Sequence, residues 1–194
     1  MSQPKLVIGA VLLLALIAGL IWQNRARLWP VRRAAYPPFS DVYLGLRSQI
    51  LQGSRIKFGL PPTNTATEPW GVVMDWGVQN GTATVMALSD GSASIYLSSG
   101  GGSIGGQGQE QIRKAAQRAV AIAAEFQGQA RPTTSYPLPE HGKVIFYILN
   151  DAGVFTASGT QDEFRTHRHA FSKLGDAMQE IVTQYRLLQT KNPP

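Results

Sequence analysis

Cysteine is absent from the 194 residues of this chain. The sequence therefore excludes disulfides, cysteine-ligated zinc, iron–sulfur clusters and thiol nucleophiles. Histidine is also scarce, with three residues, and His167 and His169 are two apart. A helix would point these two in different directions, so they would not share a metal ion as an i, i+4 pair could. No close pair of carboxylates suggests acid–base catalysis. We expect no enzyme activity, no metal site and no cofactor.

The formal net charge is +6, but the excess of basic residues lies in one short segment of the chain. Residues 1–33 contain Lys5, Arg25, Arg27, Arg32 and Arg33 and no acidic residue, so the remainder is nearly neutral. A nucleic-acid-binding domain usually gathers basic residues on one of its faces. The distribution of charge thus predicts no nucleic-acid partner.

One long apolar run is present, from Leu6 to Trp22 (LVIGAVLLLALIAGLIW). As a helix it would span about 25 Å, which is the short end of what crosses a bilayer. The alternative is a cleaved signal peptide, but the run is longer than a typical signal core and no clear cleavage site follows it. The sequence predicts a single transmembrane helix over residues 6–22.

Arginine and tryptophan follow this run closely. The predicted membrane-interface residues are Trp22, Arg25, Arg27, Trp29, Arg32 and Arg33. Positive charge favours the cytoplasmic side of a membrane, so we expect the following domain in the cytoplasm, on the bacterial inner membrane, with the periplasm as the alternative. The expected partners are the lipid bilayer and other membrane-protein subunits.

The expected organisation is a tail at residues 1–5, the membrane helix at 6–22, a basic linker at 23–38, one soluble domain at 39–189 and a tail at 190–194. Ser40 is a good N-cap for a short helix over 41–51. Asn80-Gly81 and Asp90-Gly91 are typical of tight hairpin turns, and they predict strands over 72–79, 82–88 and 93–98. A second hairpin is expected over 144–149 and 154–157.

Two longer helices are expected around this second hairpin. One covers about 109–126 and has a small-residue face able to pack on a sheet. The other opens at a capping box, Thr160 to Glu163, and runs to about Gln189. The prolines of 127–142 predict an irregular connection. The order of elements predicts an α+β fold with a largely antiparallel five-stranded sheet, a meander plus a hairpin, packed against helices.

The last expected helix has apolar residues at alternating spacings of three and four. Among them, the candidate partner contacts are Phe164, Phe171, Leu174, Met178, Ile181 and Tyr185. Two interpretations stay open. The helix could lie on its own sheet, or it could form a coiled-coil contact with a partner protein.

Residues 99–108 form a glycine-rich loop between an expected strand and an expected helix. Gly100, Gly102 and Gly105 match a dinucleotide-binding pattern, but the preceding strand belongs to a meander and no acidic residue follows at the expected distance. Ser103 lies in a Gly-x-Ser-x-Gly sequence, with Asp151 and His167 or His169 later in the chain. That hydrolase motif requires a parallel sheet, which this sequence does not predict.

Three functional hypotheses follow. The first is a non-enzymatic accessory subunit that stabilises a larger bacterial membrane complex, with respiratory and photosynthetic assemblies as candidate hosts. The second is a membrane-tethered module that binds a small ligand or nucleotide through Gly100, Gly102, Ser103 and Gly105; such a ligand is possible but unsupported. The third, which we do not expect, is a hydrolase that uses Ser103.

Overall fold

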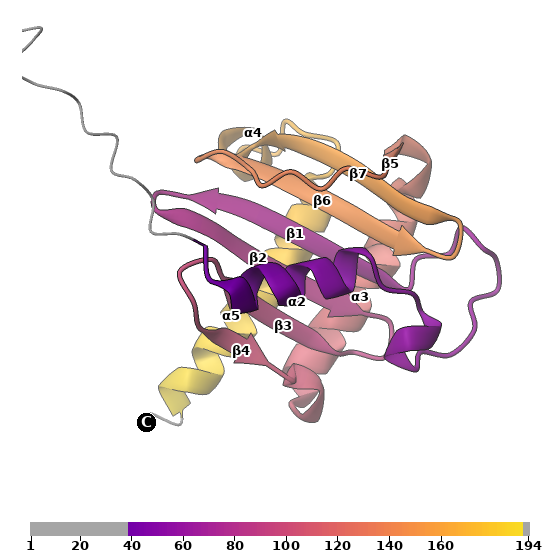
Figure 1. Cartoon of the computed structure of the whole chain (residues 1–194), viewed down its shortest axis with the longest axis horizontal. Coiled ribbons are helices and arrows are strands. Elements are labelled where there is room, and N and C mark those ends of the chain that lie inside the picture. Colours follow the sequence, from indigo (N-terminus) through magenta and orange to yellow (C-terminus); the bar gives the residue numbers. More distant parts are fainter. Residues whose placement is uncertain (1–38, 192–194) are drawn as a thin grey trace, which may run out of the picture. The chain divides into compact units, whose positions relative to one another are not determined.

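The computed structural model of this protein describes residues 39–191. They form one antiparallel sheet with the strand order β4-β3-β2-β1-β6-β7-β5. Figure 1 shows helix α2 on one face of this sheet and helices α3 and α5 on the other. The strands are β1 (Gly71–Val78), β2 (Gly81–Leu88), β3 (Ala93–Leu97), β4 (Gly102–Ile104), β5 (Arg131–Thr133), β6 (Lys143–Asn150) and β7 (Gly153–Thr160). The helices are α2 (Asp41–Leu51), α3 (Glu110–Phe126), α4 (Gln161–Arg165) and α5 (Ser172–Lys191).

Each face of the sheet has its own hydrophobic core, because side chains alternate along a strand. Val72, Met74 and Phe146 belong to the core beneath α3 and α5. Val73 and Tyr147, which lie next to them in the strands, belong to the core beneath α2. The central strands β1 and β6 are therefore buried on both sides, and α2 is needed to cover the second one.

The fold is α+β and antiparallel as predicted, but the prediction of five strands was wrong, because the sheet has seven. Strand β4 lies in the glycine-rich segment and β5 in the proline-containing connection, and each has three residues. Both lie at the edges of the sheet, where a strand can be short and a residue such as Pro132 is tolerated. Both strands were missed in the sequence because glycine and proline are uncommon in strands.

The expected single helix from Thr160 to Gln189 is divided in two. The capping box is present, with Thr160 accepting from the Glu163 N–H, but α4 ends at Arg165. His167 then adopts a left-handed conformation with φ 54°. This turn separates α4 from α5, and both Phe164 and Phe171 still reach the same core. The spacing of apolar residues continues through this turn, so the sequence pattern did not reveal the break between α4 and α5.

Two of the predictions concern residues that the structure does not describe. These are the membrane span at residues 6–22 and the interface residues Trp22, Arg25, Arg27, Trp29, Arg32 and Arg33. Over residues 39–191, no helix is long and apolar enough to span a membrane. This finding contradicts the prediction of a single-pass protein of the bacterial inner membrane, in either orientation. The described residues form an α+β domain.

Candidate functional site

The glycine-rich loop forms a β-hairpin between β3 and β4. Gly100 and Gly101 lie in its turn, with φ values of 97° and 83°. A Cβ on Gly102 would lie 2.0 Å from the carbonyl oxygen of Ile95 on the neighbouring strand. Gly105 adopts a left-handed conformation, with φ 80°, between β4 and the short helix at Gly106–Gly108. Turn geometry and close backbone approach account for these glycines without a ligand.

Acidic and basic side chains both lie near this loop, since Glu110 is paired with Lys114 at 2.6 Å and Arg113 lies against Gly91. Glu110 lies in the first turn of α3, and Asp90 accepts a hydrogen bond from the Gln107 side chain at 3.1 Å. Free N–H groups at a helix start attract anions, but nearby carboxylates oppose this attraction. The geometry of Gly100, Gly102, Ser103 and Gly105 therefore offers little support to nucleotide binding.

The hydrolase residues are separated in the fold. Ser103 pairs with Ile95 at one edge of the sheet. Asp151 lies in the β6–β7 turn and accepts a hydrogen bond from Arg55 at 2.9 Å. His169 accepts from the N–H of Phe171 at 3.1 Å. These three residues lie on different elements of the fold and are not hydrogen-bonded to one another. Within the part of the chain that is described, no group of three or more potential metal ligands is found.

The six candidate partner contacts lie inside the domain. Their exposed fractions are between 0% and 8%, and they belong to the core beneath α3 and α5: Phe164, Phe171, Leu174, Met178, Ile181 and Tyr185. Tyr185 also donates a hydrogen bond to the carbonyl oxygen of Ala93 at 2.7 Å. Of the two interpretations of this pattern, the geometry matches a helix packed on its own sheet.

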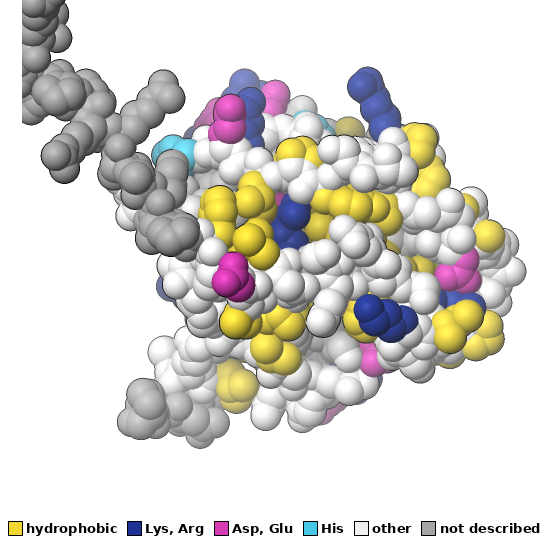
Figure 2. Space-filling view, viewed as in Figure 1, with side chains coloured by type: hydrophobic (Ala, Val, Ile, Leu, Met, Phe, Trp, Pro, Cys, Tyr) yellow, Lys and Arg dark blue, Asp and Glu magenta, His cyan; other side chains and the backbone are white. Residues whose placement is uncertain are grey.

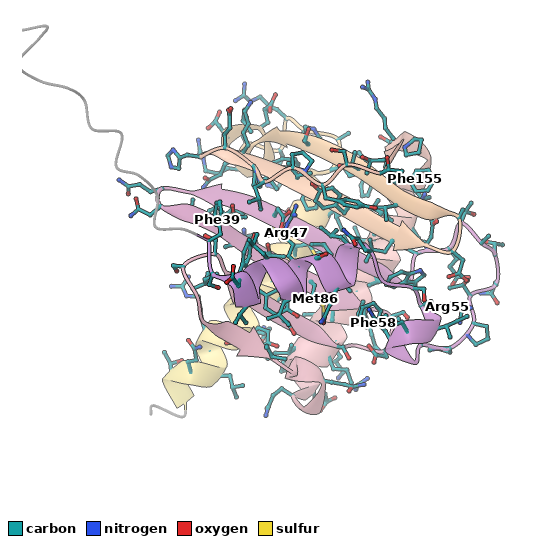
Figure 3. The ribbon with its side chains drawn as sticks, viewed as in Figure 1. Phe39, Arg47, Arg55, Phe58, Met86 and Phe155 are labelled. Carbon is teal, nitrogen blue, oxygen red and sulfur yellow. The ribbon has the colours of Figure 1, made fainter. Side chains whose placement is uncertain are left out.

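A buried ion pair attaches α2 to the opposite face of the sheet. Arg47 of α2 donates to one oxygen of Asp75 on β1, from Nε at 2.8 Å and from Nη2 at 2.6 Å. The hydroxyl of Thr84 donates to the other carboxylate oxygen at 2.5 Å, and Tyr43 shares a hydrogen bond with Thr84. Arg47 is 7% exposed and Asp75 is 0% exposed. Figure 3 shows Arg47 between α2 and the strands behind it.

The same arginine holds a second segment against the sheet. Its Nη1 and Nη2 atoms donate to the carbonyl oxygens of Tyr136 and Pro137 at 3.0 and 3.1 Å. Tyr147 donates to the Pro137 carbonyl oxygen as well, at 3.0 Å. Arg47 therefore joins α2, strand β1 and the connection that precedes β6. Its donors are occupied by protein acceptors, so the pair serves to fix α2 in place.

Burial sets the protonation of the groups around this pair. Desolvation raises the pKa of Asp75 above its usual value, while the charge of Arg47 and the hydrogen bonds from Arg47 and Thr84 act against this rise. Desolvation, together with the charge of Asp75, raises the pKa of Tyr43 to about 12. The same two causes raise the pKa of Tyr147 to about 12. Both tyrosines are neutral at ordinary pH.

The outer face of α2 has an unusual composition. We define it by the exposed residues of the helix: Asp41, Val42, Leu44, Gly45, Ser48 and Gln49. Only Asp41 is charged, while Val42 is 72% exposed and Leu44 is 41% exposed. Figure 2 shows several separate groups of hydrophobic side chains on this side of the molecule.

Gly45 lies in the middle of this outer face. Nothing lies within 4 Å of the position that its Cβ would occupy, and its φ is not positive. Neither backbone geometry nor packing within the domain therefore requires glycine here, and glycine costs roughly 0.5–1 kcal/mol relative to alanine inside a helix. Residues 41–51 contain more apolar residues than one buried face needs. This excess was the sequence signal for the exposed apolar residues of α2, and the sequence analysis did not use it.

Comparison with known proteins does not identify a function for any of these sites. The chain matches no family model, no curated protein and no solved structure in the three comparisons made with it.

Proposed function

We propose that this domain is a non-enzymatic accessory subunit that binds another protein through the outer face of α2. The observation that carries the proposal is the composition of that face, which exposes Val42 and Leu44 and has one charged residue, Asp41. Depletion of charge at the centre is the feature that distinguishes protein interfaces from other surface. Val42 and Leu44 are apolar residues in addition to those that α2 buries against the sheet.

The partner surface is expected to be apolar at its centre. Val42 and Leu44 lie at the two margins of this exposed face, since residues two apart on a helix point in different directions. Full burial of a valine or leucine side chain is worth about 1.5–3 kcal/mol, so each could add a contact to the partner. Gly45 leaves room between them for close approach of a partner backbone. A basic group of the partner near Asp41 would complement the single charge of this face.

The ion pair beneath the helix supports this role. Because Arg47 is fixed by Asp75 and by two backbone carbonyls, α2 is held in one position before binding. A preorganised surface loses less conformational entropy when a partner binds. The glycine-rich loop is the weaker candidate, because turn geometry and the close approach of Ile95 account for its glycines. Its use as a phosphate site stays a prediction from sequence.

The test is site-specific photo-crosslinking of the full chain in its own cells. A photo-reactive amino acid replaces Val42 on α2 or, as the matched control, Gln117 on the exposed face of α3. We expect position 42 to give one defined protein adduct that position 117 does not give. Adducts only with residues 1–38 of the same chain, or equal adducts from both positions, would contradict the proposal.

A second arm separates binding from folding. Because Val42 is exposed, Val42→Glu should change the stability of the domain by no more than about 0.5 kcal/mol. The same substitution should weaken partner binding by about tenfold or more, since it places a charge where the partner is expected to cover an apolar side chain. Gln117→Glu is the control and should change neither quantity.

A further inference from the structure

A cavity of about 350 Å³ lies on the other side of the sheet, between α4, α5 and strands β1 and β6. In Figure 1, α5 lies behind the sheet and α4 near its β7 edge. The walls of the cavity include the aromatic side chains of Trp76, Phe146 and Phe164. Binding sites for small molecules are concave, mainly apolar and about 300–1,000 Å³ in volume, so this cavity is at the lower end of their range.

A glycine keeps this cavity open. Gly175, the fourth residue of α5, lines it, and its φ is not positive. A Cβ there would lie 3.7 Å from a ring atom of Phe164 and 3.8 Å from one of Phe146, which are ordinary contact distances. An alanine would therefore fit. A larger side chain at this position would fill the space in front of the two rings.

The polar groups of the cavity are mostly neutral or already paired. The indole N–H of Trp76 donates to the side-chain oxygen of Gln161 at 3.1 Å, and both residues line the cavity. Arg165 is paired with Asp162 at 2.6 Å. Asp176 lies 3.6 Å from the ring of His167. The carboxamide of Gln179 and the side-chain NH2 group of Gln161 are left as hydrogen-bonding groups for a ligand.

We propose that this cavity binds a flat, uncharged aromatic molecule of one or two rings that carries one hydrogen-bonding group. The aromatic walls favour a ring, because aromatic pairs are stabilised beyond the area that they bury. The Gln179 carboxamide and the Gln161 NH2 group favour a neutral polar substituent. A charged ligand would lose its water shell, while the charged side chains of the wall, Arg165 and Asp176, already have partners. This site is separate from the outer face of α2 and does not depend on the function proposed for that face.

The test uses 2-naphthol as the probe and the full chain. NMR follows the indole N–H of Trp76 and contacts between the probe and the methyl group of Met74, another residue of the cavity wall. We expect the Trp76 signal to shift and probe–Met74 contacts to appear. No binding, or shifts that centre on another part of the chain, would overturn the proposal even if no variant were made.

Two variants of Gly175 sharpen the test. Gly175→Leu should fill the cavity and weaken 2-naphthol binding by about tenfold or more, while Gly175→Ala should change the affinity by less than about threefold. Ala124→Leu adds a side chain of the same size to the exposed face of α3 and should leave binding unchanged. Unchanged affinity in a folded Gly175→Leu variant would overturn the proposal, as would tighter binding of the anion 2-naphthoate.

Discussion

The helices on the two faces of the sheet present different surfaces to the solvent. The outer face of α2 has one charged residue, Asp41, whereas α3 exposes Glu110, Lys114, Arg118 and Glu125 and α5 exposes Lys173, Asp176, Glu180 and Arg186. Charged faces of this kind are stable in water without a partner. Exposed apolar side chains such as Val42 and Leu44 gain free energy when a partner covers them. This difference supports the proposal that α2 is the binding surface.

The two faces also differ beneath their helices. The core under α3 and α5 consists of apolar residues and Tyr185. The region under α2 contains apolar residues together with the Arg47–Asp75 ion pair, whose side chains are 8% and 0% exposed. On the other face, the pair Lys173–Glu125 joins α5 to α3, but its side chains are 55% and 51% exposed. The domain thus has a buried ion pair on one face and an exposed pair on the other.

The largest expected effect comes from breaking the buried pair. Arg47→Ala leaves the carboxyl group of Asp75 without its charged partner, and we expect a loss of about 3–5 kcal/mol in the free energy of unfolding. Lys173→Ala removes the exposed pair and should cost at most about 1 kcal/mol. Urea denaturation of the two variants measures both values.

The double variant Arg47→Met, Asp75→Leu should recover most of that loss, because it leaves no buried charge. A loss of less than about 1 kcal/mol in Arg47→Ala would show that the pair does not hold α2 in place. A double variant as unstable as the single one would assign the loss to packing and not to charge.

Alkaline pH should destabilise the α2 side next. Tyr43 and Tyr147 have pKa values raised to about 12 in the folded domain, above the ordinary value of 10.0. Below pH 10 the hydroxyls are protonated in the folded and unfolded states alike, so this contribution to stability is complete. As the pH rises from about 10 towards 12, the unfolded chain loses these protons first, and stability falls.

Denaturation curves at about pH 9 and pH 11 test this linkage. The variant with Tyr43→Phe and Tyr147→Phe lacks both titrating groups, so its stability should fall less between these two pH values than that of the wild type. An equal fall in both proteins would mean that other groups control the alkaline unfolding.

The smallest expected effect comes from the helix glycines. Gly45→Ala on α2 meets nothing within 4 Å, and Gly175→Ala on α5 makes only ordinary contacts. Each should raise the free energy of unfolding by roughly 0.5–1 kcal/mol. If Gly45 allows close approach of a partner, Gly45→Ala should also weaken partner binding. Destabilisation by either alanine, measured by urea denaturation, would contradict the geometry of these sites.

Local signals in the sequence predicted much of this fold. Helix α2 has the expected bounds, because Ser40 accepts a hydrogen bond from the N–H of Tyr43. The turns at Asn80-Gly81 and Asp90-Gly91 connect strands as predicted. Strands β4 and β5 were missed, because glycine and proline dominate these short edge segments. The left-handed turn at His167 was missed because the apolar spacing continues through it.

The candidate sites could not be predicted in the same way. Arg47 and Asp75 are 28 residues apart, and nothing in the local sequence shows that they meet. The cavity beside Gly175 needs β1, β6, α4 and α5 together, so only the tertiary structure reveals it. The composition of α2 was visible, but without the sheet its two apolar sides could not be assigned to the core and to the surface.

Hydroxyl-radical footprinting of two leucines tests the central claim most directly. Leu44 on α2 is 41% exposed and Leu187 on α5 is 48% exposed, so the two share a residue type and a similar exposure on opposite sides of the sheet. The measurement compares their oxidation in intact cells and in the purified chain. We expect cells to protect Leu44 and to leave Leu187 as reactive as in the purified protein. Equal oxidation of both leucines in cells, or protection of Leu187 alone, would contradict the account.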